Sequence, residues 1–198
     1  MTNIVITGLV MMVCLAIPIV HFERRKVNAE EIVVIALMSA VAAVARVPFA
    51  SLPSVQPTSF IIIITAYTLG AETGLIVGTL AALISNMFLG QGPWTPWQMF
   101  CWGMMGLSSG LLRNTWVMKN KFLRLAFGFG WGYLFGWIMN LWFVVQFEQG
   151  VSIKVFLLAC VSSFYFDLNH ALSNIFFMLV FFKSWERILR RTKIKYMS

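Results

Sequence analysis

The residues with the most chemical potential lie between Tyr165 and Asn174, inside a long apolar segment near the C-terminus. Asp167, His170 and Asn174 are spaced by three and four positions, so a helix places them on one face. A carboxylate inside a membrane is costly unless it is paired or hydrated. Two interpretations are open: a polar face lining a cavity open to the outside, and a structural Asp–His pair that joins helices. We include Tyr165, Asp167, Asn169 and His170 among the candidate binding residues.

A metal site at this stretch is not predicted. A zinc-type site needs three or four ligands, and the other histidine, His21, lies near the opposite membrane edge. Cys14, Cys101 and Cys160 stand far apart in apolar runs at no metal-binding spacing, so we interpret them as packing residues. The chain also has no P-loop pattern and is not expected to hydrolyse ATP by itself. We therefore expect no metal, no cofactor and no catalytic residue.

A second informative stretch runs from Leu89 to Gln98 and contains two glycines, two prolines, two tryptophans and two glutamines. Glycine and proline break helices, and apolar segments lie on both sides of the stretch. This pattern predicts a loop at the membrane surface, where tryptophan rings lie at the level of the headgroups. The loop is either a plain interfacial turn or the cover of a bound ligand. Trp94, Trp97 and Gln98 are candidate binding residues on the second interpretation.

Four further candidates are expected at the same membrane surface. Arg46 ends an apolar segment, where its guanidinium either binds an anionic ligand group or extends to the headgroups. Gln56 closes the loop that follows, and Asn140 and Trp142 lie near the outer end of another segment. The combined set is rich in rings and amides and carries few charges, which suits a large, mostly neutral organic ligand.

The segment Gly106–Gly110 matches the G-x-S-x-G pattern of serine hydrolases. That motif needs a sharp turn between a strand and a helix, whereas here it lies inside an apolar helix. An intramembrane enzyme that pairs Ser108 or Ser109 with His170 is therefore a minor alternative. A structural membrane protein that binds no solute is the other.

The composition predicts one integral membrane domain spanning residues 1–198. The chain is 60% hydrophobic and 11% charged, with a mean hydropathy of +0.82, whereas soluble domains carry about 25% charged residues. Long apolar runs without strict alternation indicate helices rather than a barrel. We predict an all-α integral membrane protein with helices at about 2–20, 30–46, 58–69, 74–88, 98–112, 125–147 and 153–183.

The basic residues predict the orientation of these helices. With the N-terminus outside, only Arg46 and Lys154 of the 15 lysines and arginines fall on the outer side. This strong positive-inside asymmetry places the C-terminus in the cytoplasm. Orientation and anionic lipid then explain the net charge of +8, without nucleic acid.

The second predicted helix is rich in small residues, and Ala36 and Ala40 share a face that lets another helix approach closely. This pair, the glycine turn at 70–74 and the outer loop together resemble the substrate-binding S-components of energy-coupling factor (ECF) vitamin transporters, over residues 27–190. The resemblance implies a six-helix bundle, so segment 2–20 would be an additional helix. It also implies that Ala36 and Ala40 contact the membrane coupling subunit, with Ser39 and Ala43 as an alternative register.

The resemblance further implies a complex with that coupling subunit and two cytosolic ATPases. The solute would be captured from outside, and the whole S-component would then topple in the bilayer. Within the family, loop 90–98 and stretch 166–174 look like the branch linked to cobalamin uptake. This implies cobalamin or a related corrinoid as the transported ligand, with another vitamin or a queuosine precursor as the alternative.

Overall fold

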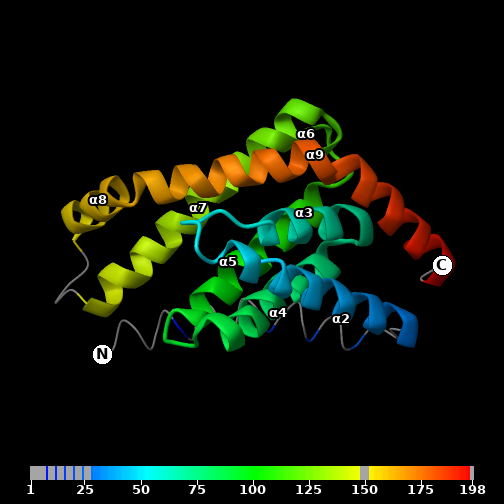
Figure 1. The fold of residues 1–198 in the computed structure, drawn as a ribbon, viewed down its shortest axis with the longest axis horizontal. Helices are drawn as coiled ribbons and strands as arrows, with labels where there is room; N and C mark the ends of the chain where they lie inside the picture. Colours follow the sequence, from blue (N-terminus) through cyan, green and yellow to red (C-terminus); the bar gives the residue numbers. More distant parts are fainter. Residues whose placement is uncertain are drawn as a thin grey trace.

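The computed structural model describes residues 28–147 and 152–196, together with the single positions 8, 12, 16, 20 and 24. Every element in this described part is a helix, as Figure 1 shows. The elements are α2 (Ala29–Val44), the 3₁₀ turn η1 (Val47–Phe49), α3 (Thr58–Leu69), α4 (Ala71–Leu89), α5 (Thr95–Leu112), α6 (Trp116–Lys119), α7 (Lys121–Phe147), α8 (Ile153–Ser162) and α9 (Phe164–Tyr196). The predicted helix at 2–20 falls almost wholly outside the described residues and stays a prediction.

Four of the described helices are long and apolar enough to cross a membrane. They cover Ala29–Phe49, Ala71–Leu89, Lys121–Gln146 and Phe164–Lys195, whereas α3 and α8 are shorter apolar helices. Large apolar side chains stand exposed on these helices, among them Leu37, Phe88 and Phe176. Such surfaces suit a lipid environment, and the predicted all-helical membrane bundle is confirmed.

Helix α3 forms the centre of the bundle. It contacts α4 and α5 on one side and α9 on the other, and Figure 1 shows it between these two layers. All of its residues except Tyr67 are buried, including the run Phe60–Ile64. A helix that is apolar around its whole circumference must be enclosed, which explains why this short segment lacks an amphipathic pattern.

Glycines allow the neighbouring helices to approach closely. A Cβ atom added to Gly78 would collide with the backbone of Trp102, and one added to Gly106 would collide with the backbone of Gly74. These two contacts join α4 to α5. On the other side of the bundle, Gly132 of α7 lies against the backbone of Ala171 in α9. Such small-residue contacts are typical of helix packing in membranes.

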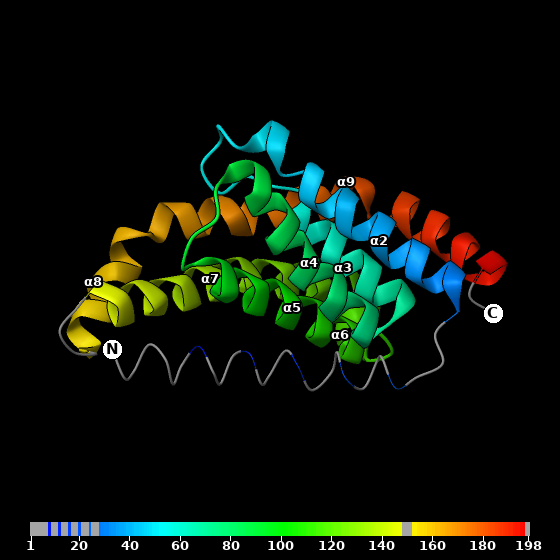
Figure 2. The ribbon, with the colours of Figure 1, turned by 90° about the horizontal axis from the view of Figure 1, so that it is seen from below.

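The predicted helix at 153–183 is wrong in two respects. It is broken at Ser163, so that α8 ends at Ser162 and α9 starts at Phe164, and Figure 2 shows α8 folded beside the end of α7. Helix α9 also continues through the basic segment 183–195, which the sequence presented as a tail. Hydrogen bonds of the Ser163 side chain accompany the break, since Ser163 Oγ donates to Asp167 Oδ2 at 2.8 Å and accepts from Asn140 at 2.8 Å.

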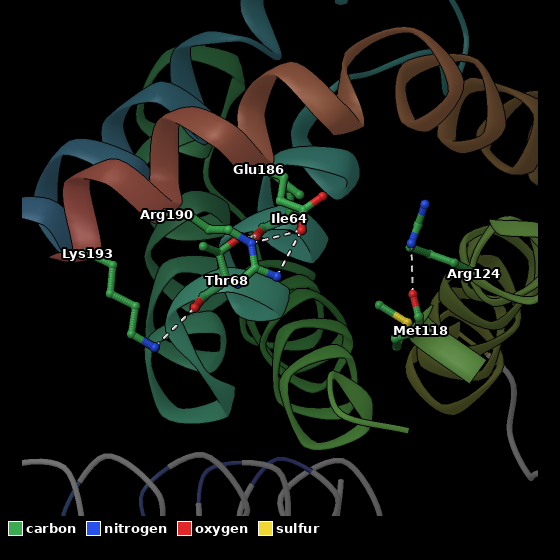
Figure 3. A network of polar contacts seen from close by, with 7 residues as sticks. All are labelled: Ile64, Thr68, Met118, Arg124, Glu186, Arg190 and Lys193. Atoms are coloured by element: carbon green, nitrogen blue, oxygen red, sulfur yellow. Dashed lines mark hydrogen bonds and ion pairs between the residues drawn. The ribbon is translucent and has the colours of Figure 1, made fainter. Parts of the chain in front are cut away.

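The basic part of α9 is attached to the bundle, as Figure 3 shows. Lys193 Nζ donates to the carbonyl of Thr68 at 3.3 Å. Arg190 pairs with Glu186 one turn earlier at 2.9 Å and lies over the ring of Tyr67. These contacts join the end of α9 to the end of α3.

Three smaller boundaries also differ from the prediction. The turn at 70–74 contains a single non-helical residue, Gly70, whose φ of 127° suits glycine, and α4 begins at once at Ala71. Helix α5 begins at Thr95, because a proline in the first turn of a helix removes no intrahelical hydrogen bond. Helix α7 begins at Lys121, after Asn120 accepts hydrogen bonds from the first turn of the helix.

The glycine contacts predict opposite effects at two positions of α7. Gly132→Ala adds a methyl group against the backbone of Ala171, and we expect it to lower the unfolding free energy by roughly 1–3 kcal/mol. Gly130→Ala is the matched control, since a Cβ there meets nothing within 4 Å, and alanine favours a helix by about 0.5–1 kcal/mol. Thermal unfolding in detergent measures both variants, and equal shifts of the two midpoints would contradict this packing.

Candidate functional site

A cavity of about 480 Å³ lies where α2 ends and α3 and α5 begin. The Tyr67–Arg190 and Thr68–Lys193 contacts lie at the opposite end of α3. The wall combines six apolar residues with four polar ones, and the polar set includes three of the predicted binding residues, Arg46, Gln56 and Gln98. The lining residues are Arg46, Phe49, Ala50, Leu52, Ser54, Val55, Gln56, Leu89, Gln98 and Phe135.

Arg46 faces the interior of the bundle rather than the headgroups. Its Nη1 atom donates to Ser85 Oγ at 3.0 Å and to Asn86 Oδ1 at 2.8 Å, and its guanidinium lies 5.1 Å from the centre of the Trp102 ring. Among the described residues, no carboxylate forms an ion pair with Arg46. Neutral groups and one aromatic ring therefore hold a charged side chain at the wall of the cavity.

Asn86 connects this arginine to the start of α5. Its Nδ2 atom donates to Gln98 Oε1 at 2.7 Å and to Thr95 Oγ1 at 2.9 Å. Thr95 in turn donates to Gln91 Oε1 at 3.0 Å. The side chains of Asn86 and Thr95 are buried, so buried hydrogen bonds join the loop before α5 to α4 and to Arg46. Asn86 was not among the predicted site residues, although an asparagine within an apolar helix was the available signal.

His170 lies one layer behind the cavity. Its Nε2 atom is 2.7 Å from Ser59 Oγ, which also accepts from Trp102 Nε1 at 3.2 Å. The ring edge of His170 packs against Phe135, with 5.1 Å between centroids, and Phe135 lines the cavity. His170 and Ser59 are both buried, so they support the wall rather than form its surface.

Asp167 belongs to a separate polar cluster between α7 and α9. It accepts from Ser163, and Ser163 accepts from Asn140. Gly136 leaves the space that the carboxylate fills. No hydrogen bond or ion pair joins Asp167 to His170, so the structural Asp–His pair considered from the sequence is absent from the described residues. The two positions are three apart on a helix, which leaves about 60° between their directions.

The remaining candidates are distributed over three places. Trp94 and Trp142 meet edge to face at 6.1 Å between ring centroids, and this contact joins the start of α5 to the C-terminal part of α7. Trp97 is buried in the first turn of α5. Asn169 is exposed and its Nδ2 atom lies 3.4 Å from the carbonyl of Pro53, whereas Tyr165 is 75% exposed and does not line the cavity.

The serines of the G-x-S-x-G pattern satisfy the helix backbone. Ser108 Oγ donates to Met104 at 2.7 Å and accepts from Trp131, and Ser109 Oγ donates to the carbonyl of Ile63 at 3.1 Å. Neither serine contacts His170 in the described residues. In this geometry His170 cannot act as the general base for Ser108 or Ser109. The described part also contains no group of three or more histidine, cysteine or acidic side chains that could hold a metal ion.

The small residues of α2 divide between two faces. Ala36 and Ala40 are exposed, whereas Ser39 and Ala43 are buried inside the bundle. Ser39 Oγ also donates to the carbonyl of Ile35 at 2.8 Å. Of the two registers considered, the exposed one is therefore Ala36–Ala40.

The position of Asn86 predicts a stability effect. Asn86→Leu removes one of the two hydrogen bonds of Arg46 and leaves Gln98 Oε1 without its Asn86 donor, and we expect a loss of about 1–3 kcal/mol in unfolding free energy. Asn169→Leu is the control, because this exposed asparagine makes only one long hydrogen bond. Chemical denaturation in mild detergent measures both, and an equal loss in the two variants would contradict a structural role for Asn86.

The comparisons with known proteins agree with this architecture. Residues 30–191 match the family of the ECF transporter, substrate-specific component. No curated protein and no solved structure matches the chain. The matched segment covers most of the sequence and includes α3 to α8, η1 and nearly all of α2 and α9. Membership implies a multi-pass membrane protein that works as a transport subunit with a coupling subunit and ATPases. The chain belongs to the family of substrate-specific components of ECF transporters.

Proposed function

We propose that this chain captures a compact organic solute, a vitamin or a queuosine precursor, from the outer side of the membrane and delivers it to the coupling subunit. The observation that carries this proposal is the cavity of about 480 Å³ between the segment 46–56, the end of α4, the start of α5 and the middle of α7. Pockets for drug-sized ligands span roughly 300–1,000 Å³ and combine apolar walls with a few polar groups. The lining combines both kinds of group, with Phe49 and Phe135 on the apolar side and Arg46, Gln56 and Gln98 on the polar side.

The orientation proposed for the chain follows from its charges. The cavity lies at the end of the bundle that holds few basic residues, whereas Arg113, Lys119 and Arg124 flank the turn at the opposite end. By the positive-inside rule, the cavity faces outward and the C-terminus lies in the cytoplasm. The N-terminus, outside the described part, is proposed to lie on the outer side.

A corrinoid such as cobalamin is the second candidate. The edge-to-face pair Trp94–Trp142, together with nearby Asn140, supports it, because a broad ring system with many amides needs aromatic surfaces and neutral hydrogen-bonding partners. The volume of the cavity favours the smaller solute, since a corrinoid is larger than drug-sized ligands. Binding of a corrinoid would require the loops at 47–57 and 89–94 to move apart.

Uptake into cells tests the proposal and separates these two candidates. The chain is expressed with an ECF coupling module in cells that lack their own importers, and growth is measured on trace amounts of single vitamins, cobinamide or a queuosine precursor. We expect rescue by one compact solute that depends on this chain. Rescue by cobalamin or cobinamide alone would select the corrinoid, and no rescue by any solute would contradict the proposed function.

The exposed pair Ala36 and Ala40 is proposed as the face that meets the coupling subunit. Small residues four apart let two helix backbones approach, and leucine at both positions prevents this. We expect the double variant Ala36→Leu/Ala40→Leu to lose at least about tenfold in transport while solute binding is retained.

The control for this prediction is Gly130→Leu, which places a leucine side chain at an exposed position of α7. Its transport rate should remain near that of the unmodified chain. Transport by the double alanine variant at the control rate would exclude this face as the coupling surface.

A further inference from the structure

The wall of the cavity carries one charged residue, Arg46, and no acidic residue among the described lining residues. The guanidinium is partly buried and is oriented from three sides by Ser85, Asn86 and the ring of Trp102. Both of these hydrogen bonds use Nη1. No described residue accepts a hydrogen bond from Nη2 or Nε. These donors of the planar guanidinium remain available to a ligand.

The hydrogen-bond chain determines which polar atoms face the solute. An arginine only donates, so Asn86 must present Oδ1 to Arg46. Its Nδ2 atom is then directed to Gln98, which must present Oε1 in return. The polar atom of Gln98 that remains for the cavity is therefore the Nε2 amide, which is a donor. This removes the usual ambiguity between the oxygen and nitrogen atoms of a side-chain amide. The guanidinium can only donate, which fixes the orientation of Asn86, and Asn86 then fixes that of Gln98.

The position of the nearby acidic groups supports the same conclusion. Asp167 is directed toward Gly136 and Ser163 in the cluster between α7 and α9, and it does not line the cavity. A cation in a membrane interior normally has an anionic partner. Within the described part of the cavity, that partner is left for the ligand to supply.

We propose that the transported solute carries a carboxylate or phosphate group that binds Arg46 and the Gln98 amide, with its compact apolar body against Phe49 and Phe135. This inference rests on the proposed function and names the chemical class of its solute. A planar carboxylate matches the fork of a guanidinium, and such charge-assisted bonds are stronger than neutral ones. In a partly buried site, the difference in affinity between an anionic solute and its neutral amide is therefore large.

Pairs of compounds that differ only in this group test the proposal. The purified chain in lipid nanodiscs is titrated with nicotinate and nicotinamide, pantothenate and pantothenol, biotin and its primary amide, and benzoate and benzamide, and thermal stabilisation reports binding. We expect at least one acid to bind roughly 100-fold more tightly than its neutral partner. Phosphate monoesters of the neutral alcohols separate a phosphate from a carboxylate.

Three variants assign the preference to its residues. Arg46→Gln is expected to abolish the difference between acid and neutral partner, and Arg46→Lys should keep part of it. Gln98→Glu keeps an oxygen for Asn86 but places an internal anion beside Arg46, so it should lose acid binding without loss of thermal stability. The matched control Lys154→Gln removes the same charge from an exposed position at the same end of the bundle and should leave the preference unchanged.

The outcomes separate this proposal from the proposed function. Equal or tighter binding of the neutral compounds, or an acid preference that survives in Arg46→Gln, would overturn the anion site and leave the solute-binding subunit intact. Stabilisation by none of the compounds would overturn the anion site, and the uptake assay would then decide the proposed function by itself.

Discussion

The structure depends on one constraint, which is that a charged guanidinium must be satisfied inside a membrane bundle. Arg46 is the residue on which this constraint acts, and its partners come from different helices: Ser85 and Asn86 from α4, and Trp102 from α5. Removing hydrogen-bond partners in a low-dielectric interior is expensive, so the three helices are held at a fixed separation. Arg46 also lines the cavity, so the contacts that satisfy its charge lie directly behind the cavity wall.

Much of the fold could be predicted from the sequence because lipid permits few solutions. The lengths of the apolar segments and the positions of the turn residues predicted the exact bounds of α3. They predicted the bounds of most other helices to within a few residues. The break at Ser163 was not predicted, since a serine in an apolar run has no strong helix-breaking tendency and the sequence does not show the tertiary hydrogen bond that Ser163 accepts from Asn140. The helical structure of the basic segment 183–195 was not predicted for the same reason. The ring of Tyr67 and the carbonyl of Thr68, both distant in the sequence, hold this segment.

The residue types of the candidate site could be predicted from the sequence, but the positions of these residues relative to one another could be predicted less well. Arg46, Gln56 and Gln98 come together as lining residues, although they are distant in the sequence. His170 and Asp167 share a helix face, yet the angle between them is enough to direct one toward α3 and the other toward α7. Tyr165, a predicted binding residue, is exposed and lies outside the lining of the cavity. Sequence spacing identifies a face, whereas the neighbours that each side chain meets depend on helix crossing.

The length of α9 has a consequence for how deeply the protein sits in a bilayer. Its 33 residues extend about 50 Å at 1.5 Å per residue, whereas the hydrocarbon layer is about 30 Å thick. The surplus corresponds to about 13 residues, which is the length of the basic segment 183–195. Because Lys193 and Arg190 attach this segment to α3, its charges and the bundle must move together. The basic end of α9 therefore sets how deeply the whole bundle lies relative to the headgroups. Any tilt of the bundle must also move these charges along the headgroup layer.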